Sequence, residues 1–151
     1  MDISSVFAHR YHALGEAQQQ DWRRLAVFSG SFDAAAAAAV WELKTTRELP
    51  PDAVAHIRLT RLVSLGLLEH NKLRYRFRLS QTGREFARSL LAGDELALCQ
   101  QRHANYYLKL QSLAARLSQQ GGSNEQIGMA LLASEAAEIQ AGQRWAAQEQ
   151  A

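Results

Sequence analysis

Apolar residues near the start of the chain recur every three or four positions, which is the spacing of one face of a helix. One run covers residues 3–14 and is followed by Gly15, and a second covers Glu16–Phe28 and is followed by Ser29–Ser31. Glycine and serine favour a turn after each run. The pattern therefore predicts two helices before residue 30, the first of them a lead-in helix over residues 2–15.

Two more helices follow before the pattern changes. Asp33 stands directly before six alanines and Val40–Leu43, which predicts a capped and closely packed short helix. Pro50 and Pro51 mark a turn, and Asp52 is expected to cap a helix over Ala53–Leu65. We expect the buried side chains of this helix to be Val54, Ile57, Leu62, Val63 and Leu65.

The segment Leu73–Leu79 alternates apolar residues with arginine, and this period of two indicates a strand with one buried face. Its apolar side chains are Leu73, Tyr75, Phe77 and Leu79. A turn at His70–Lys72 would connect this strand to a short partner strand, Leu67–Glu69. The chain is therefore expected to contain a small two-stranded β-hairpin.

Helical spacing returns after the hairpin. We expect a helix over Arg84–Leu91, and after Gly93 a long helix that ends at Gly121. A last helix over Glu125–Gln148 would be capped by Ser123 or Asn124. The resulting fold class is mainly α, with one domain over residues 1–91 and an antiparallel helical hairpin over residues 92–151.

Composition sets limits on the cell compartment. The chain has a single cysteine, Cys99, which excludes an internal disulfide and fits a reducing compartment. Its first residues lack the basic and apolar regions of a signal peptide, and no apolar run is long enough to span a bilayer. We therefore expect a cytoplasmic protein without a membrane partner.

Positive charge is concentrated in Ala53–Leu91, where eight basic residues stand against two acidic ones, giving +6 in a chain of net charge +2. The basic residues are Arg58, Arg61, Lys72, Arg74, Arg76, Arg78, Arg84 and Arg88. Such a segment suits phosphate contacts, although arginines that alternate along a hairpin are also typical of a solvated face.

Candidate metal and catalytic residues occur only in pairs. His9 and His12, and likewise Cys99 and His103, lie on single helical faces, but two ligands are too few for structural or catalytic zinc. Cys99 also lacks the exposed loop that a nucleophile needs. No Gly-x-x-x-x-Gly-Lys-Ser/Thr loop is present. We expect no catalytic residue, metal or bound cofactor in this chain.

Two segments resemble bacterial winged-helix regulators. Leu59–His70 looks like a third helix that leads into a wing strand, and Arg76–Ala87 looks like the second wing strand that leads into the next helix. The resemblance implies a DNA-binding regulator. Its DNA contacts would be Arg58 and Arg61 on the third helix, and Lys72, Arg74 and Arg76 on the wing.

A resemblance over nearly the whole chain is to signalling ATPases of the STAND class, including the NB-ARC proteins. The segments that carry it are Tyr11–Leu14, Trp22–Asp33, Val40–Trp41, Leu62–Leu68, Tyr75–Phe77, Arg84–Ala87, Arg102–Tyr107 and Ala136–Ala146. In that family a winged helix follows the nucleotide-binding core and leads into helical repeats. The resemblance implies that this chain is a fragment: a winged helix and the start of a TPR-like array.

The same resemblance implies the roles of partners and of one site residue. An upstream core would bind ADP or ATP, the winged helix would pack on that core, and the repeats would continue downstream and bind a protein ligand. Ser80 stands where many members carry a histidine that contacts the phosphates of ADP. Serine cannot supply the cationic contact of an imidazolium, so nucleotide sensing by Ser80 itself is not expected.

The regulatory interpretation is preferred because Ile57, Leu59 and Leu62 leave few polar base-reading side chains on the third helix. DNA stays open as the alternative partner.

Overall fold

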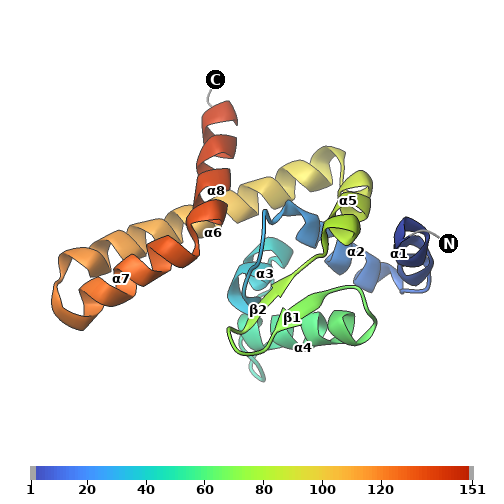
Figure 1. Ribbon diagram of the computed structural model, residues 1–151, viewed down its shortest axis with the longest axis horizontal. Coiled ribbons are helices and arrows are strands. Elements are labelled where there is room, and N and C mark those ends of the chain that lie inside the picture. Colours follow the sequence, from blue (N-terminus) through green and yellow to red (C-terminus); the bar gives the residue numbers. More distant parts are fainter. Residues whose placement is uncertain (1–2, 150–151) are drawn as a thin grey trace. The chain divides into compact units, whose positions relative to one another are not determined.

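The computed structural model describes residues 3–149 of the protein. Over these residues the chain is mainly helical with one small antiparallel sheet, which confirms the expected class (Figure 1). Residues 1–2 and 150–151, at the outer ends of the two expected domains, lie outside the described residues, as do the side chains of Ile3 and Ser4. The chain forms two compact units, Met1–Cys99 and Gln100–Ala151.

The first unit contains five complete helices, a 3₁₀ turn and the two strands. In order these are α1 (Ile3–His12), α2 (Glu16–Arg24), η1 (Leu25–Val27), α3 (Ala34–Trp41), α4 (Pro51–Ser64), β1 (Glu69–Asn71), β2 (Arg76–Arg78) and α5 (Gln81–Leu90). The boundary between the units lies within the long helix α6 (Gly93–Gln119). The predicted helix over Glu16–Phe28 is observed as α2 followed directly by the 3₁₀ turn η1, and Phe28 lies just after that turn.

Helix α3 forms where the alanine run predicts it. The Asp33 carboxylate accepts a hydrogen bond from the Ala36 amide at 2.9 Å, so Asp33 is the N-cap as expected. The middle alanines, Ala36–Ala38, are buried. Alanine side chains let α3 approach α4 closely, and these two helices form the most extensive contact between elements of the unit.

Helix α4 departs from two expectations. It starts at Pro51 with Pro50 as N-cap, so Asp52 lies in the first turn and the predicted cap is wrong. Proline suits the first helical position because a backbone amide there would have no hydrogen-bond acceptor within the helix. Ile57 and Leu65 are 43% and 44% exposed, contrary to prediction, while Ala55, Leu59 and Leu62 are buried.

The sheet places Phe77 at its centre. In β2, Phe77 pairs with His70 of β1, and on its other side it exchanges two backbone hydrogen bonds of 2.8 and 2.9 Å with Phe32. Phe77 stacks on both rings, and its His70 contact has a centroid distance of 4.2 Å. Phe32 therefore acts as a one-residue third strand between α2 and α3.

The hairpin is shorter than the alternating pattern predicts. Its partner strand is Glu69–Asn71 rather than Leu67–Glu69, and the chain reverses over residues 72–75 rather than 70–72. Leu73 is 93% exposed and Tyr75 is 74% exposed, so their predicted burial is wrong. Only Phe77 and Leu79 of the alternating residues face the core, because a four-residue turn takes the others away from it.

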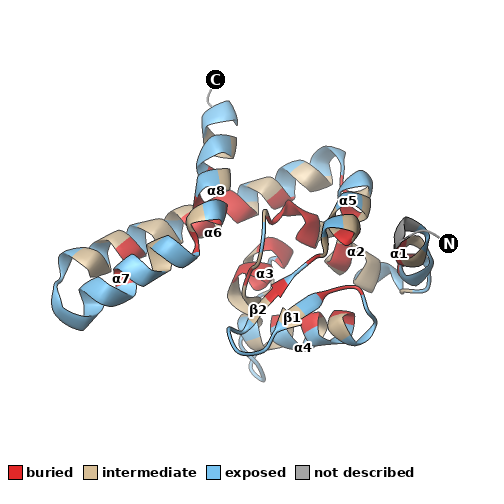
Figure 2. Ribbon diagram, in the orientation of Figure 1, coloured by how far each residue is buried: buried red, intermediate tan, exposed pale blue. Residues whose placement is uncertain are grey.

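Buried positions of the first unit gather where its elements face one another (Figure 2). The core surrounds Trp22 of α2, which is fully buried. Its indole nitrogen donates to the Leu67 carbonyl oxygen at 2.8 Å, and its rings lie against Phe7, Tyr11 and Phe86. One side chain thereby connects α1, α2, α5 and the segment before β1.

Helix α5 begins at Gln81, three residues earlier than predicted, with Ser80 as its N-cap. The Ser80 hydroxyl accepts a hydrogen bond from the Gly83 amide at 3.1 Å.

The second unit contains the rest of α6, then α7 (Gly122–Ser134) and α8 (Ala136–Glu149). The predicted single helix over Glu125–Gln148 is wrong because the chain bends at Glu135. The predicted caps Ser123 and Asn124 lie inside α7, whose N-cap is Gly121.

Small residues allow close helix packing in this unit. Gly128 of α7 lies against the backbone of Ala114 and Ser118, and Gly142 of α8 lies against Ala104. Within residues 3–149, no helix is both long and apolar enough to cross a bilayer.

Candidate functional site

The five candidate DNA-contacting residues divide into two groups, and the two residues of the first group have partners within the first unit. Arg58 lies 3.6 Å from the Asp21 carboxylate of α2. Arg76 donates to both the hydroxyl and the carbonyl oxygen of Ser31, at 3.1 and 2.8 Å. These two guanidinium groups attach α4 and β2 to the N-terminal part of the unit.

The second group is exposed. Arg61 lies on the outer face of α4, and Lys72 and Arg74 lie on the hairpin turn. None of the three forms an ion pair with another described residue. Burial of Leu59 and Leu62 leaves a mainly polar outer face on α4, which the sequence interpretation did not anticipate. The exposed residues of that face include His56, Thr60, Arg61 and Ser64.

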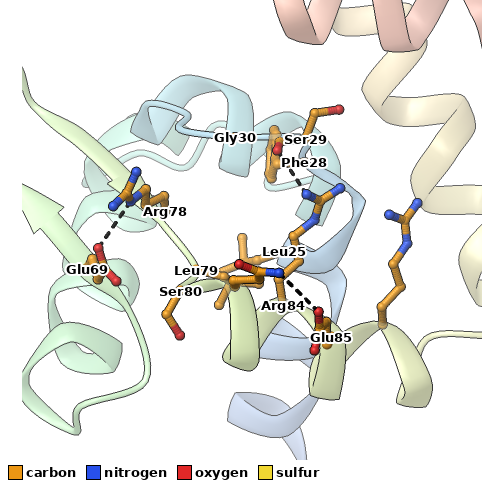
Figure 3. Close-up of a pocket in the computed structure, with 12 residues that line it drawn as sticks. Leu25, Phe28, Ser29, Gly30, Glu69, Arg78, Leu79, Ser80, Arg84 and Glu85 are labelled. Atoms are coloured by element: carbon orange, nitrogen blue, oxygen red, sulfur yellow. Dashed lines mark hydrogen bonds and ion pairs between the residues drawn. The ribbon is translucent and has the colours of Figure 1, made fainter.

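A groove of about 640 Å³ lies beside the start of α5 (Figure 3). One wall is Phe28–Gly30, the other is the exposed side of α5, and β2 ends between them. Arg84 crosses the groove and donates to the Ser29 carbonyl oxygen at 3.0 Å. Arg78 is held at one end by Glu69, at 3.1 Å. Arg88, one turn beyond Arg84, lines the same groove and is exposed.

Ser80 lines this groove, but its hydroxyl oxygen is occupied as the cap of α5. A hydroxyl that accepts from an amide keeps its proton available for one weak donation, which differs from the charged contact of an imidazolium. The arginines of the groove are the cationic groups around Ser80. The sequence places Arg84 and Arg88 in the basic segment, and Arg84 also in segments that carry the family resemblances, but nothing in the local pattern predicts that Phe28–Gly30 lies opposite them.

An ion-pair cluster between α2 and the start of α6 was also not predicted. Glu95 accepts from Arg23 through both carboxylate oxygens, at 2.7 and 2.9 Å, and from Arg24 at 3.2 Å. The hydrogen bonds from Arg23, with a smaller contribution from Arg24, lower the pKa of Glu95 below its usual value of 4.5. Nearby Asp21 shows the opposite behaviour, since burial raises the pKa of its carboxyl group.

We expect Glu95→Gln to destabilise the protein by about 1–2 kcal/mol at pH 7, because it removes the charge of a half-buried, bidentate pair. Since folding lowers the pKa of Glu95, its stabilisation is present above pH 4.5 and is lost as the pH falls through the folded value. Urea unfolding of both proteins at pH 7 and pH 3 measures this. A stability gap that stays constant between these pH values would contradict the assignment.

The histidine of β1 lies in a mainly aromatic environment. His70 stacks on Phe77 and contacts the edge of His56, and its Nε2 atom is buried without a hydrogen-bond partner among the described residues. Loss of hydration, together with His56 and Lys72, lowers the pKa of His70 below 6.5. Since folding lowers the pKa of His70, the stabilisation from its neutral form is lost as the pH falls below 6.5.

The histidine and cysteine residues considered as metal ligands lie in separate parts of the chain. His9 and His12 are exposed, Cys99 is buried in the first unit, and His103 contacts the Glu138 carboxylate at 2.8 Å in the second. Among the described residues no three histidine, cysteine, aspartate or glutamate side chains gather as metal ligands would.

Comparisons with protein-family models, with curated proteins and with solved structures found no match to this chain. A functional proposal therefore depends on the geometry of the chain and on its motifs.

Proposed function

We propose that this chain is a non-catalytic regulatory module of a STAND-type signalling ATPase. The first unit would be a winged helix that docks on an upstream nucleotide-binding core. The second unit would begin a TPR-like array that binds a protein ligand. The order α2, Phe32, α3, α4, β1, β2 and α5 supports the winged-helix part, since it places a three-helix group against a sheet with a protruding hairpin.

The observation that carries this proposal is the composition of the groove walls. One wall comes from Trp22–Asp33 and the other from the helix that contains Arg84–Ala87, which are two of the segments that carry the resemblance. These segments are far apart in sequence, and the hydrogen bond from Arg84 to Ser29 joins them. We infer that the groove is the surface that faces the nucleotide-binding core.

The docking of a separate domain suits a groove of this kind. Its lining is mixed in charge, with Arg78, Arg84 and Arg88 beside Glu69 and Glu85, and such polar surfaces are typical of interdomain contacts. ADP or ATP would be bound by the core and not by this chain alone. Docking that depends on the bound nucleotide would then bias the equilibrium between resting and active states.

The test starts from the reading frame upstream of Met1, which under this proposal would encode the nucleotide-binding core. We expect the longer polypeptide to contain a P-loop and to bind ADP by calorimetry, and Arg88→Glu to weaken that binding at least fivefold by disturbing the docked state. Arg47→Glu, which changes an exposed charge outside the groove, is the matched control. An upstream region without a P-loop or nucleotide binding would overturn the proposal.

A DNA-binding regulator is the second candidate, favoured by the exposure of Arg61, Lys72 and Arg74 beside the polar face of α4. The internal roles of Arg58 and Arg76 count against it, because they remove two of the five predicted contacts.

Fluorescence polarisation with a random DNA duplex separates the two candidates. Under the regulatory proposal we expect no saturable binding at 50 mM salt. If three cations contact DNA phosphates, the logarithm of the association constant should instead fall with the logarithm of the salt concentration at a slope of about −2.7. The DNA candidate would be established by such a slope together with loss of binding in the triple variant Arg61→Gln, Lys72→Gln and Arg74→Gln.

A further inference from the structure

The end of the β-hairpin exposes two large apolar side chains that are two positions apart in sequence. We call residues Lys72–Tyr75 the hairpin tip. Leu73 is 93% exposed and Tyr75 is 74% exposed, whereas the other exposed large apolar residues of the described chain reach 59%. Exposing this much apolar surface to water is unfavourable, so the tip is suited to a partner that covers both side chains.

The backbone holds these side chains outward. Tyr75 has a φ of 57°, in the left-handed region that residues other than glycine adopt at a cost. The Asn71 side-chain oxygen accepts from the Arg74 amide at 3.3 Å and orders the turn. Leu73 and Tyr75 therefore lie on a turn whose backbone conformation is held by a local hydrogen bond.

Positive charge alternates with the apolar residues of the tip. Lys72 and Arg74 are exposed and form no ion pair with another described residue. The next basic residues of β2 are engaged, Arg76 with Ser31 and Arg78 with Glu69. The tip thus presents two cations and two apolar groups together.

We propose that the hairpin tip inserts into the surface of an anionic lipid bilayer. Leu73 would enter the boundary of the acyl chains, Tyr75 would lie among the headgroups, and Lys72 and Arg74 would contact anionic lipid groups. Amphipathic side chains with an apolar body and a polar end favour this interface, and cations next to it gain from its negative surface potential. A protruding turn can insert into a bilayer surface, because insertion does not require a pocket of complementary shape.

This contact is peripheral and needs no spanning helix. It differs from the expectation that the chain has no membrane partner, which was based on the lack of a signal peptide and of an apolar run long enough to span a bilayer. It is independent of the proposed regulatory function, because the tip and the groove beside α5 have no lining residue in common.

The test is cosedimentation of the full chain with sucrose-loaded vesicles. We expect binding to vesicles of phosphatidylcholine and phosphatidylserine at 7:3, weakened by salt, and little binding to phosphatidylcholine alone. The double substitution Lys72→Gln with Arg74→Gln should lower the partition coefficient roughly 30-fold. Each charge contributes about 1 kcal/mol to binding, and about 1.4 kcal/mol corresponds to a tenfold change. Leu73→Ala with Tyr75→Ala should lower it at least tenfold, by removing the inserted apolar groups.

Matched controls change the same residue types elsewhere. Ile57→Ala removes an exposed apolar side chain of α4, and Lys44→Gln with Arg47→Gln removes two exposed cations; both should bind like the wild type. All these positions are exposed, and circular dichroism checks that each variant folds. The proposal is overturned if the wild type does not bind anionic vesicles at 50 mM salt. It is equally overturned if the tip variants bind as tightly as the controls.

Discussion

Replacing Trp22 by alanine is expected to destabilise the protein by about 4–5 kcal/mol, the largest effect of any single substitution that we predict. The side chain is fully buried and contacts the aromatic rings of Phe7, Tyr11 and Phe86. Its removal leaves a cavity and takes the indole donor from the Leu67 carbonyl oxygen. Small domains are stable by about 5–15 kcal/mol, so this loss removes at least about a quarter of the stability, and urea unfolding should find a clearly lower midpoint.

Two variants separate the causes of this loss. Trp22→Phe keeps most of the ring contacts and removes the hydrogen bond, so we expect an intermediate loss of about 1.5–3 kcal/mol. Leu73→Ala changes a large apolar residue that is 93% exposed, and we expect it to stay within about 0.5 kcal/mol of the wild type. A loss below about 2 kcal/mol for Trp22→Ala would mean that the first unit does not depend on this residue.

The second large effect is expected at Gly128, where α7 crosses α6. An added Cβ atom would overlap the Ala114 carbonyl oxygen and lie 2.7 Å from the Ser118 amide nitrogen. Both are backbone atoms, so only separation of the helices relieves the overlap. We expect Gly128→Ala to cost about 2–3 kcal/mol, although alanine by itself favours a helix over glycine by about 1 kcal/mol.

Hydrogen exchange measured by mass spectrometry locates this effect, because amides of α7 should exchange faster while those of α3 and α4 should not. The matched control is Gly15→Ala, since an added Cβ there meets nothing within 4 Å and the residue has an ordinary φ of −69°. Gly142→Ala, with a Cβ 3.2 Å from the Ala104 Cα, should fall between the two. Unchanged exchange in α7 would show that the two helices are not in such close contact.

Local interactions explain the parts of the fold that the sequence predicts well. Asp33 caps α3 because its carboxylate needs only the amide of Ala36, three residues away. Phe77 is buried in a strand because strong alternation at Arg76–Arg78 makes one face apolar. Each of these outcomes depends on neighbours within a few residues.

Long-range contacts decide the remaining features of the fold. The chain bends at Glu135 without a glycine or proline there, while nearby Glu138 contacts His103 and Gly142 packs on Ala104. The apolar pattern of Glu125–Gln148 continues through the bend, so no local signal marks it. Leu73 and Tyr75 continue the strand pattern in sequence, yet they lie on the turn that closes the hairpin.

The candidate sites show the same division. The helical class, the presence of a hairpin and the position of the basic segment could be predicted from the sequence, because spacing and charge are properties of neighbouring residues. Which arginines have internal partners depends on the folded arrangement, in which Arg58 meets Asp21 and Arg76 meets Ser31. It also brought Phe28–Gly30 opposite α5, since a groove forms only where segments distant in sequence pack together.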